Sequence, residues 1–282
     1  MEALSLQEVV PVRHWRARLE VDFGVRAGRT VPVRRVHSGP LVVQRPFYPE
    51  GGVCHLYLLH PPGGLVGGDA LEVGLAVAPQ AHALVTTPGA TKFYRSNGLE
   101  ASQTQHLRVG SNAALEWLPQ ETIGFDGAKA RTHCRVELED GARFIGWETL
   151  VPGRPAGGHL FRTGCLRQRL ELWRGDEPLV VDALTLDGDG GLLHAAAGLS
   201  GRRCLATLLA TPVTRELLEA VRTQVAAPDS AQLGITLIDD LLVCRYLGDE
   251  ALAARAVFER IWALLRPALL GRPACTPRIW RT

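Results

Sequence analysis

Short apolar segments, with glycine, proline, asparagine or aspartate in nearly every gap between them, make up most of this 282-residue chain. The pattern is clearest from Gln44 to Asn97, where three corners rich in proline and glycine interrupt the apolar segments. These corners are Arg45–Gly51, His60–Asp69 and Thr86–Ser96. Such residues let the backbone turn sharply. Since no connection here is long enough for a helix, the pattern favours stacked antiparallel sheets over β-α-β units.

Three segments alternate apolar and polar side chains, as strands with one buried and one wet face do. The alternation is regular in Trp15–Phe23 and Arg131–Leu138, and weaker in Leu166–Leu172. Further strands are expected at the short apolar runs Val53–Leu59, Leu71–Ala78, Ala113–Leu118 and Arg143–Leu150.

Helical patterns occur only near the C-terminus. Thr211-Pro212 suits the N-cap and first position of a helix from Val213 to Val225. A second helix is expected between Asp249 and Pro267, because apolar residues recur there at helical spacing, at Phe258, Ile261, Trp262 and Leu265. We therefore predict a single, mainly β domain over residues 1–282 that carries two helices near its C-terminus.

Bulk properties exclude several classes of partner. The net charge of +2 is close to neutral, so no global field draws the chain to nucleic acid or to a membrane surface. Met1–Ser5 lacks the pattern of a secretory signal, and polar residues, prolines and glycines interrupt the longest uncharged stretches. The six cysteines are scattered without a Cys-x-x-Cys pair, which indicates reduced core thiols rather than a disulfide framework. We expect a cytoplasmic protein.

Familiar catalytic and binding motifs are missing from the sequence. There is no Gly-x-x-x-x-Gly-Lys-[Ser/Thr] phosphate loop. Gly63–Gly68 is only superficially similar to a dinucleotide fingerprint, because no helix follows it to bind the anion. The neighbouring residues of Cys54-His55 and of His133-Cys134 point to opposite faces of a strand, so neither pair can readily clamp one ion. A tight structural zinc site is therefore not expected.

Three carboxylates are better candidates for function. Asp69 closes the double-glycine corner, and Glu121 and Glu148 follow apolar, tryptophan-containing segments. A carboxylate in such surroundings must be paired, protonated, bound to a metal or facing water in a cavity. The alternative for each is a structural role as a hydrogen-bond acceptor, for Asp69 from its own turn.

A set of segments, in order along nearly the whole chain, is distinctive when taken together. They are Gln44–Gly51, Cys54–Asp69, Thr86–Ser96, Leu115–Glu121, Gly153–Ala156 and Pro277–Thr282. They closely resemble the UreD (UreH) family of urease accessory proteins. The resemblance implies an elongated, mainly β fold of stacked antiparallel or mixed sheets with few helices. It also implies a maturation factor that is not an enzyme, a scaffold for nickel insertion into apo-urease. Its partners would be UreF and the GTPase UreG, which hydrolyses the GTP, and UreE would supply the nickel.

An internal tunnel is proposed to carry nickel through proteins of this family, so the resemblance implies transient nickel and no tightly bound cofactor. Nickel binds nitrogen, oxygen and sulfur donors strongly. A conduit therefore needs sites that desolvate the ion enough to admit it and still release it. We expect four carboxylates to line the route with two threonines nearby: Asp69, Glu121, Glu148 and Asp182, with Thr86 and Thr87.

The sequence departs from the family pattern after Gly153–Ala156, where Gly158-His159 replaces the usual Gly-Glu. Neutral histidine still ligates nickel, but it lacks the permanent negative charge. If His159 lies on the route, nickel loading is expected to weaken at lower pH. Asp182 stands where glutamate is common, which shortens the reach of the side chain and keeps its charge.

Two functions of other classes stay open at this stage. A hydrolase or isomerase could use Asp69 and Glu121 as acid and base, provided that both lie in one solvent-reached pocket. A plain binding module would handle no metal at all. For UreF, a docking surface on the helix Asp249–Arg266 and the arginines Arg278 and Arg281 is one possibility, and packing of that helix on the sheet is the other.

Overall fold

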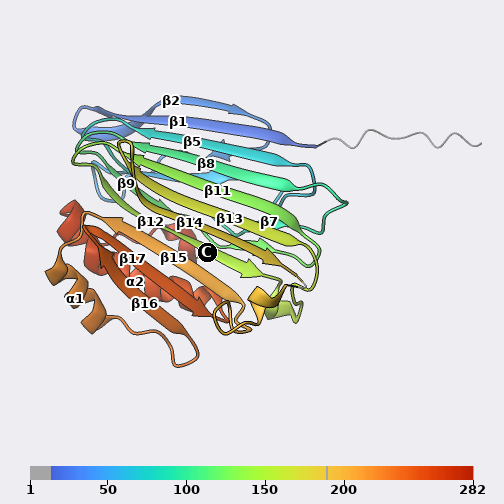
Figure 1. Cartoon of the computed structure of the whole chain (residues 1–282). Helices are drawn as coiled ribbons and strands as arrows, with labels where there is room; N and C mark the ends of the chain where they lie inside the picture. Colours follow the sequence, from blue (N-terminus) through green and yellow to red (C-terminus); the bar gives the residue numbers. More distant parts are fainter. Residues whose placement is uncertain (1–13, 189, 282) are drawn as a thin grey trace, which may run out of the picture.

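Two stacked β-sheets and a layer of helices form the molecule (Figure 1). This computed structural model describes residues 14–188 and 190–281. The Met1–Ser5 segment, the side chain of Arg281 and Thr282 lie outside the described part. One sheet, the outer sheet, has an exposed face, whereas the other, the central sheet, is covered on both faces.

The outer sheet has seven strands. In spatial order they are β14 (Glu177–Asp187), β13 (Cys165–Arg174), β11 (Lys129–Leu138), β8 (Ala101–Val109), β5 (Ala70–Val77), β1 (Arg16–Arg26) and β2 (Arg29–Ser38).

The central sheet has ten strands. Its main path runs through β16 (Gln232–Ile238), β17 (Leu241–Gly248), β15 (Cys204–Thr211), β12 (Arg143–Pro152), β9 (Ala114–Leu118), β6 (His82–Thr86), β4 (Cys54–Leu59) and β3 (Val42–Val43). Beside that path, β10 (Thr122–Gly124) pairs with β12 and with β7 (Thr91–Phe93).

From β4 to β13 the chain winds back and forth between the two sheets, so that neighbours within each sheet run parallel. Parallel strands need a long crossover, and here a strand of the opposite sheet provides it in place of a helix. Antiparallel pairs occur at β1–β2, β13–β14 and β3–β4 and among β12, β15, β17 and β16. The sheets are thus stacked and mixed. The preference for antiparallel pairing was wrong for the winding region.

The two sequence patterns separate between the two sheets with one exception, the apolar run Leu71–Ala78, which became β5 of the outer sheet. The alternating segments became β1, β11 and β13 of the outer sheet, which faces solvent on one side. The unbroken apolar runs at Val53–Leu59 and Ala113–Leu118 became β4 and β9 of the central sheet. One core cluster lies between the sheets and a second between the central sheet and the helices, so central strands are buried on both faces.

Both expected helices are present, with different ends. Helix α1 (Arg215–Gln224) begins after Thr214, whose side chain accepts a hydrogen bond from the Leu217 amide, and not after Thr211. Thr211 still belongs to β15, so its strand pairing decides the boundary. Helix α2 (Ala251–Leu270) follows Glu250, continues past Pro267 and ends at Gly271, whose φ of 65° suits glycine. Neither helix has the length and apolarity to cross a bilayer.

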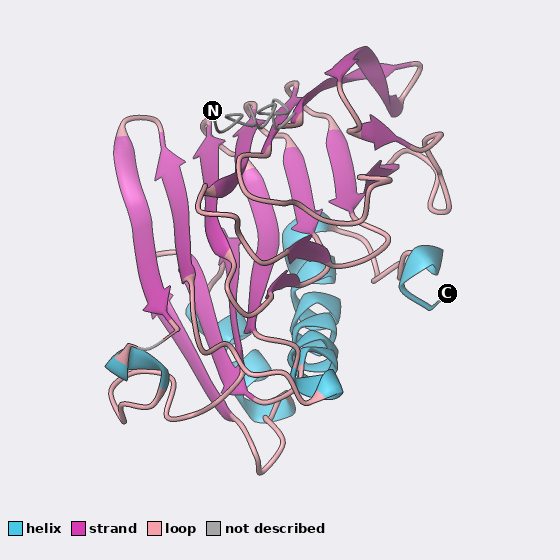
Figure 2. Cartoon of the chain, turned by 90° about the vertical axis from the view of Figure 1, so that its right-hand side faces the viewer, coloured by secondary structure: helices cyan, strands magenta, loops and turns pink. Residues whose placement is uncertain are grey.

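The helices lie on one face of the central sheet (Figure 2). The apolar side of α2, including Phe258, Ile261 and Trp262, is buried there. The apolar side of α2 therefore packs on the sheet, which was the alternative to a docking surface on this helix. The C-terminal turn η3 (Arg278–Arg281) brings Trp280 against Trp147 and Trp262. Two other short turns are η1 (Pro155–Gly157) and η2 (Gly191–Leu193).

Candidate functional site

A row of polar side chains crosses the inner face of the outer sheet, where apolar residues are the rule. Strand register aligns Gln103 of β8 with Thr132 of β11, and Thr132 with Gln168 of β13. Gln105 lies two residues further along β8 on the same face, and it pairs in register with Cys134 of β11. Alternation of side chains places all of them between the two sheets. The core is therefore polar at this point, although apolar residues surround it.

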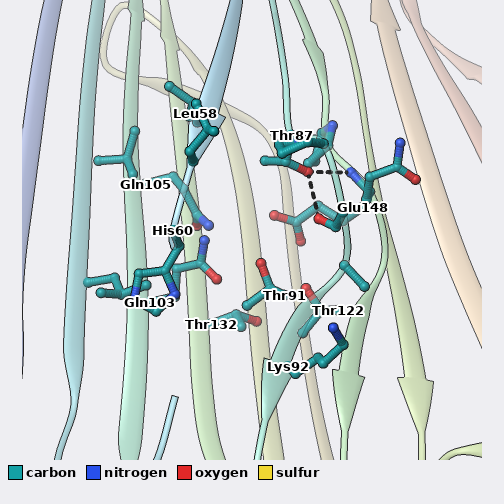
Figure 3. A pocket seen from close by; sticks show the side chains of 18 of the residues that line it. Leu58, His60, Thr87, Thr91, Lys92, Gln103, Gln105, Thr122, Thr132 and Glu148 are labelled. Carbon is teal, nitrogen blue, oxygen red and sulfur yellow. Dashed lines mark hydrogen bonds between the residues drawn. The ribbon is translucent and has the colours of Figure 1, made fainter. Parts of the chain in front are cut away.

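A cavity of about 210 Å³ lies next to this polar row. The outer sheet contributes Gln103, Gln105, Thr132 and Gln168, and the central sheet and its turns contribute His60, Thr87, Thr91, Thr122 and Glu148. Figure 3 shows Gln103, Gln105 and His60 on one side of this space, and Thr87, Thr122 and Glu148 on the other. We call it the first cavity.

A second cavity of about 230 Å³ lies towards β14 and β15. Glu148 and Gln168 line both cavities, so the two spaces lie next to each other at this pair. The side-chain amide of Gln168 donates a 2.8 Å hydrogen bond to Glu148. At the far side of the second cavity Asp182 lies 3.0 Å from the guanidinium of Arg245. The two neighbouring polar cavities between the sheets, which together we call the passage, thus have one carboxylate where they adjoin and another towards β14.

Glu148 is the carboxylate common to both cavities, and Lys92 also lines the first of them. Burial raises the pKa of its carboxyl to about 7, although hydrogen bonds from Gln168 and the Cys134 thiol favour the charged form, and the nearby negative charge of Asp182 raises the pKa further. A carboxyl group with such a pKa exchanges its proton for a cation at neutral pH with little penalty. This carboxyl group is therefore an exchangeable acid at neutral pH rather than a fixed anion.

Of the residues predicted from the sequence, the structure brings Thr87, Glu148 and Asp182 into the passage. Thr86 points the other way, because adjacent side chains of a strand face opposite sides. Its hydroxyl donates to the Leu118 carbonyl and accepts a 2.9 Å bond from Trp280. Thr87 accepts a 2.9 Å bond from the Gln120 amide at the cavity wall.

Asp69, Glu121 and His159 are not among the residues that line either cavity. The carboxylate of Asp69 is engaged with the backbone amides of Trp15 and Val66, at 2.9 Å each, as the structural alternative requires. Glu121 lies near Cys204, on the side of the central sheet that faces the helices. His159 is exposed on the turn after η1. Asp69 and Glu121 therefore do not lie together in either cavity. The structure does not support an active site that uses these two carboxylates as acid and base.

Comparison with known proteins decides the family. The family described as "UreD urease accessory protein" matches residues 16–281. The chain belongs to the UreD family. Proteins called urease accessory protein UreD are similar to it along nearly their whole length. That of Citrobacter koseri is 46% identical over 272 residues, or 96% of this chain and 93% of the relative. That of Klebsiella aerogenes is 45% identical, covering 95% and 97%, and that of Pseudomonas putida 46% identical, covering 95% of each.

This UreD chain also contains a buried cluster of charged groups that the sequence did not reveal. Glu50, His55 and Cys275 have possible ligand atoms within 4.8 Å of one another. The guanidinium of Arg266, however, donates to both oxygens of Glu50, at 2.6 and 2.8 Å, and also to Glu116. A cation already occupies the carboxylate, so this cluster is better described as an ion-pair network than as a metal site.

The glutamines that line the two cavities were not predicted from the sequence, although the signal was present. Gln168 and Thr132 occupy the apolar phase of alternating strands, and polar residues in that phase must face something polar. Gln103 and Gln105 in β8 carry the same signal. Their alignment into one row depends on the parallel register of β8, β11 and β13, which the sequence pattern alone did not provide.

Proposed function

We propose that this chain is a non-catalytic scaffold for nickel insertion into apo-urease, and that nickel passes through the passage between its sheets. In this proposal it works in the cytoplasm in a complex with UreF and UreG, the GTP hydrolysis belongs to UreG, and UreE delivers the nickel. Nickel is then cargo, and the chain keeps no tightly bound cofactor. Membership in a family of urease accessory proteins supports the maturation role.

The observation that carries the proposal is that two polar cavities between the sheets share Glu148 and Gln168 in their walls. Buried polar groups in a protein core are normally paired with each other. Here Gln168 is paired with Glu148, but both side chains also line two adjacent cavities, which extend from the turn that contains Thr87 to the carboxylate of Asp182. Such a lining replaces part of the water shell of an ion along the way.

The chemistry of the lining suits transport better than storage. Hydroxyl and amide oxygens are weak ligands for nickel, and the second carboxylate of the path, Asp182, is already paired with Arg245. A cluster of thiolates would hold nickel too tightly to release it. The Cys134 thiol beside Glu148 is kept protonated, because burial and the neighbouring carboxylate raise its pKa well above the usual value.

The test is nickel loading of apo-urease by the complete accessory complex with GTP. Glu148→Gln keeps the shape of the side chain and removes its charge, so we expect nickel incorporation and urease activity to fall about tenfold, the effect of losing roughly 1.4 kcal/mol of ion stabilisation. Metal content is measured by mass spectrometry. Glu137→Gln is the matched control, because Glu137 is a carboxylate on the outer face of β11.

Assembly of the variant with UreF and UreG is checked by size-exclusion chromatography. Normal nickel loading by an assembled Glu148→Gln complex would show that the ion takes another route.

A further inference from the structure

Three side chains that line the first cavity have a buried polar atom without a hydrogen-bond partner within the described chain. They are His60 Nε2, Gln105 Oε1 and Trp117 Nε1. Gln105 is 6% exposed and Trp117 is 3% exposed. An unsatisfied buried polar group costs about 1–3 kcal/mol. Three such groups around one cavity need polar partners within that space, and water and a metal ion are the two kinds that fit it.

The kind of guest follows from which atoms are free. The amide oxygen of Gln105 is an acceptor with lone pairs, and a neutral imidazole has a lone pair on one nitrogen. Burial lowers the pKa of His60 despite the opposing effect of Asp69, so the ring is neutral at pH 7. Trp117 can only donate and does not bind a cation. One nitrogen and one oxygen are thus available to a metal ion.

Local structure holds both groups in place. His60 directly follows β4, at the start of the turn to Gly63, where its carbonyl accepts a 2.9 Å bond from the Gly63 amide. Gln105 lies in the middle of β8, which pairs on both sides with parallel neighbours. Figure 3 shows His60 and Gln105 on the same side of the cavity, facing the threonines and Glu148.

We propose that His60 Nε2 and Gln105 Oε1 form a second nickel-holding position in the first cavity, which selects transition-metal ions over Mg²⁺ and Ca²⁺. The inference rests on the proposed function and adds the specificity of the passage. Imidazole nitrogen favours nickel and zinc, whereas Mg²⁺ and Ca²⁺ prefer oxygen ligands. Since both donors are neutral, they hold the ion weakly enough for transfer to the carboxylate of Glu148, which lines the same cavity.

The test is direct binding of Ni²⁺ and of Mg²⁺ to the full-length chain, copurified with UreF, by isothermal titration calorimetry. We expect His60→Ala and Gln105→Leu each to weaken Ni²⁺ binding about tenfold or more, and His60→Ala to leave Mg²⁺ binding unchanged. His60→Asn, which stays polar, serves as a second variant if His60→Ala does not fold. His106→Ala is the matched control, since His106 follows Gln105 on β8 and is exposed on the outer face.

X-ray absorption of the nickel-loaded protein should show an imidazole ligand that disappears in His60→Ala. Ni²⁺ affinity equal to that of His106→Ala in both the His60 and Gln105 variants would overturn the inference and leave only water in this space. The two proposals fail separately. If Glu148→Gln blocks urease loading while the His60 variants bind normally, the passage stands without this position. If the His60 variants lose Ni²⁺ binding while no variant changes nickel loading of urease, the binding position is supported and transport through the passage is not.

Discussion

At the scale of single residues, the position of one carboxyl group inside the molecule sets its chemistry. Glu148 and Glu116 belong to neighbouring strands of the central sheet, β12 and β9. Glu116 faces the helices, where hydrogen bonds from His82 and Arg266 outweigh the effect of burial and lower its pKa. Glu148 faces the cavities and is met by a neutral amide and a thiol, so burial prevails and its pKa rises. Which face of a strand a glutamate occupies thus decides whether it is a fixed anion or an exchangeable one.

Glu148 should make the stability of the metal-free protein depend on pH. Because the folded-state pKa of about 7 lies above the ordinary value of 4.5, the folded state binds a proton that the unfolded state has lost between these pH values. The cost to folding is absent below about pH 4.5 and complete above about pH 7, where it reaches roughly 3 kcal/mol. Glu148→Gln should therefore stabilise the protein at pH 8 and have little effect at pH 5.

Urea denaturation of the wild type and of Glu148→Gln at the two pH values measures this difference. A gain in stability that is equal at pH 5 and pH 8 would mean that Glu148 does not titrate in this range.

At the scale of elements, helix α2 is attached to the central sheet by apolar packing and by one fully buried cation. Arg266 bonds to Glu116 of β9 and to Glu50, and Trp262 of the same helix donates to Glu116. Burial would raise the pKa of Glu50, but the hydrogen bonds from His55 and Arg266 hold it at about 2. The network joins residues more than 200 positions apart in sequence and fixes both the helix and the turn before β4.

Removing the cation from this network should strongly destabilise the protein. Arg266→Met leaves Glu50 and Glu116 buried without their partner, and breaking such a pair costs about 3–5 kcal/mol. Chemical denaturation with Arg260→Met as the control measures the effect, because Arg260 lies on the exposed side of the same helix. Adding Glu50→Gln and Glu116→Gln to Arg266→Met should recover part of the loss. A loss of stability equal to that of Arg260→Met would show that the Arg266 network does not stabilise the fold.

At the scale of the whole molecule, the winding of the chain between two sheets creates the passage. Each turn of the winding adds one strand to each sheet, and the inner faces come together along the length of the molecule (Figure 1). Polar residues at matching register positions on successive strands then form a continuous lining. Polar cavities between the sheets thus require a few polar residues within an otherwise apolar core, and no separate domain.

A bulky side chain in the lining should close the route without removing any carboxylate. Thr132→Trp projects into the first cavity from the centre of the polar row. We expect nickel loading of urease to fall at least tenfold while assembly with the partners is retained, at a stability cost of about 1–3 kcal/mol for overpacking. Thr104→Trp, on the outward-facing phase of β8, is the control for size. Nickel loading that is equal in the two variants would contradict a passage through this space.

Much of the fold was predictable from the sequence because strand patterns are local. The alternation in Trp15–Phe23 and Arg131–Leu138 depends only on neighbouring residues, and both segments are strands with one exposed face. Helix boundaries were less predictable. Asp249 is engaged with Arg202 at 2.8 Å rather than capping α2, and Pro267 lies within the helix. These outcomes depend on partners that are distant in sequence.

The sequence by itself determined the family, the short β segments, the sharp corners and the residues available for chemistry, because each is encoded in adjacent positions. Only the tertiary structure decided that Glu148, Asp182 and Thr87 line one passage while Asp69, Glu121 and His159 lie outside its cavities. The physical reason is register. A shift of one residue turns a side chain to the opposite face of its strand, and the partner strands that fix this register are set by the winding of the entire chain.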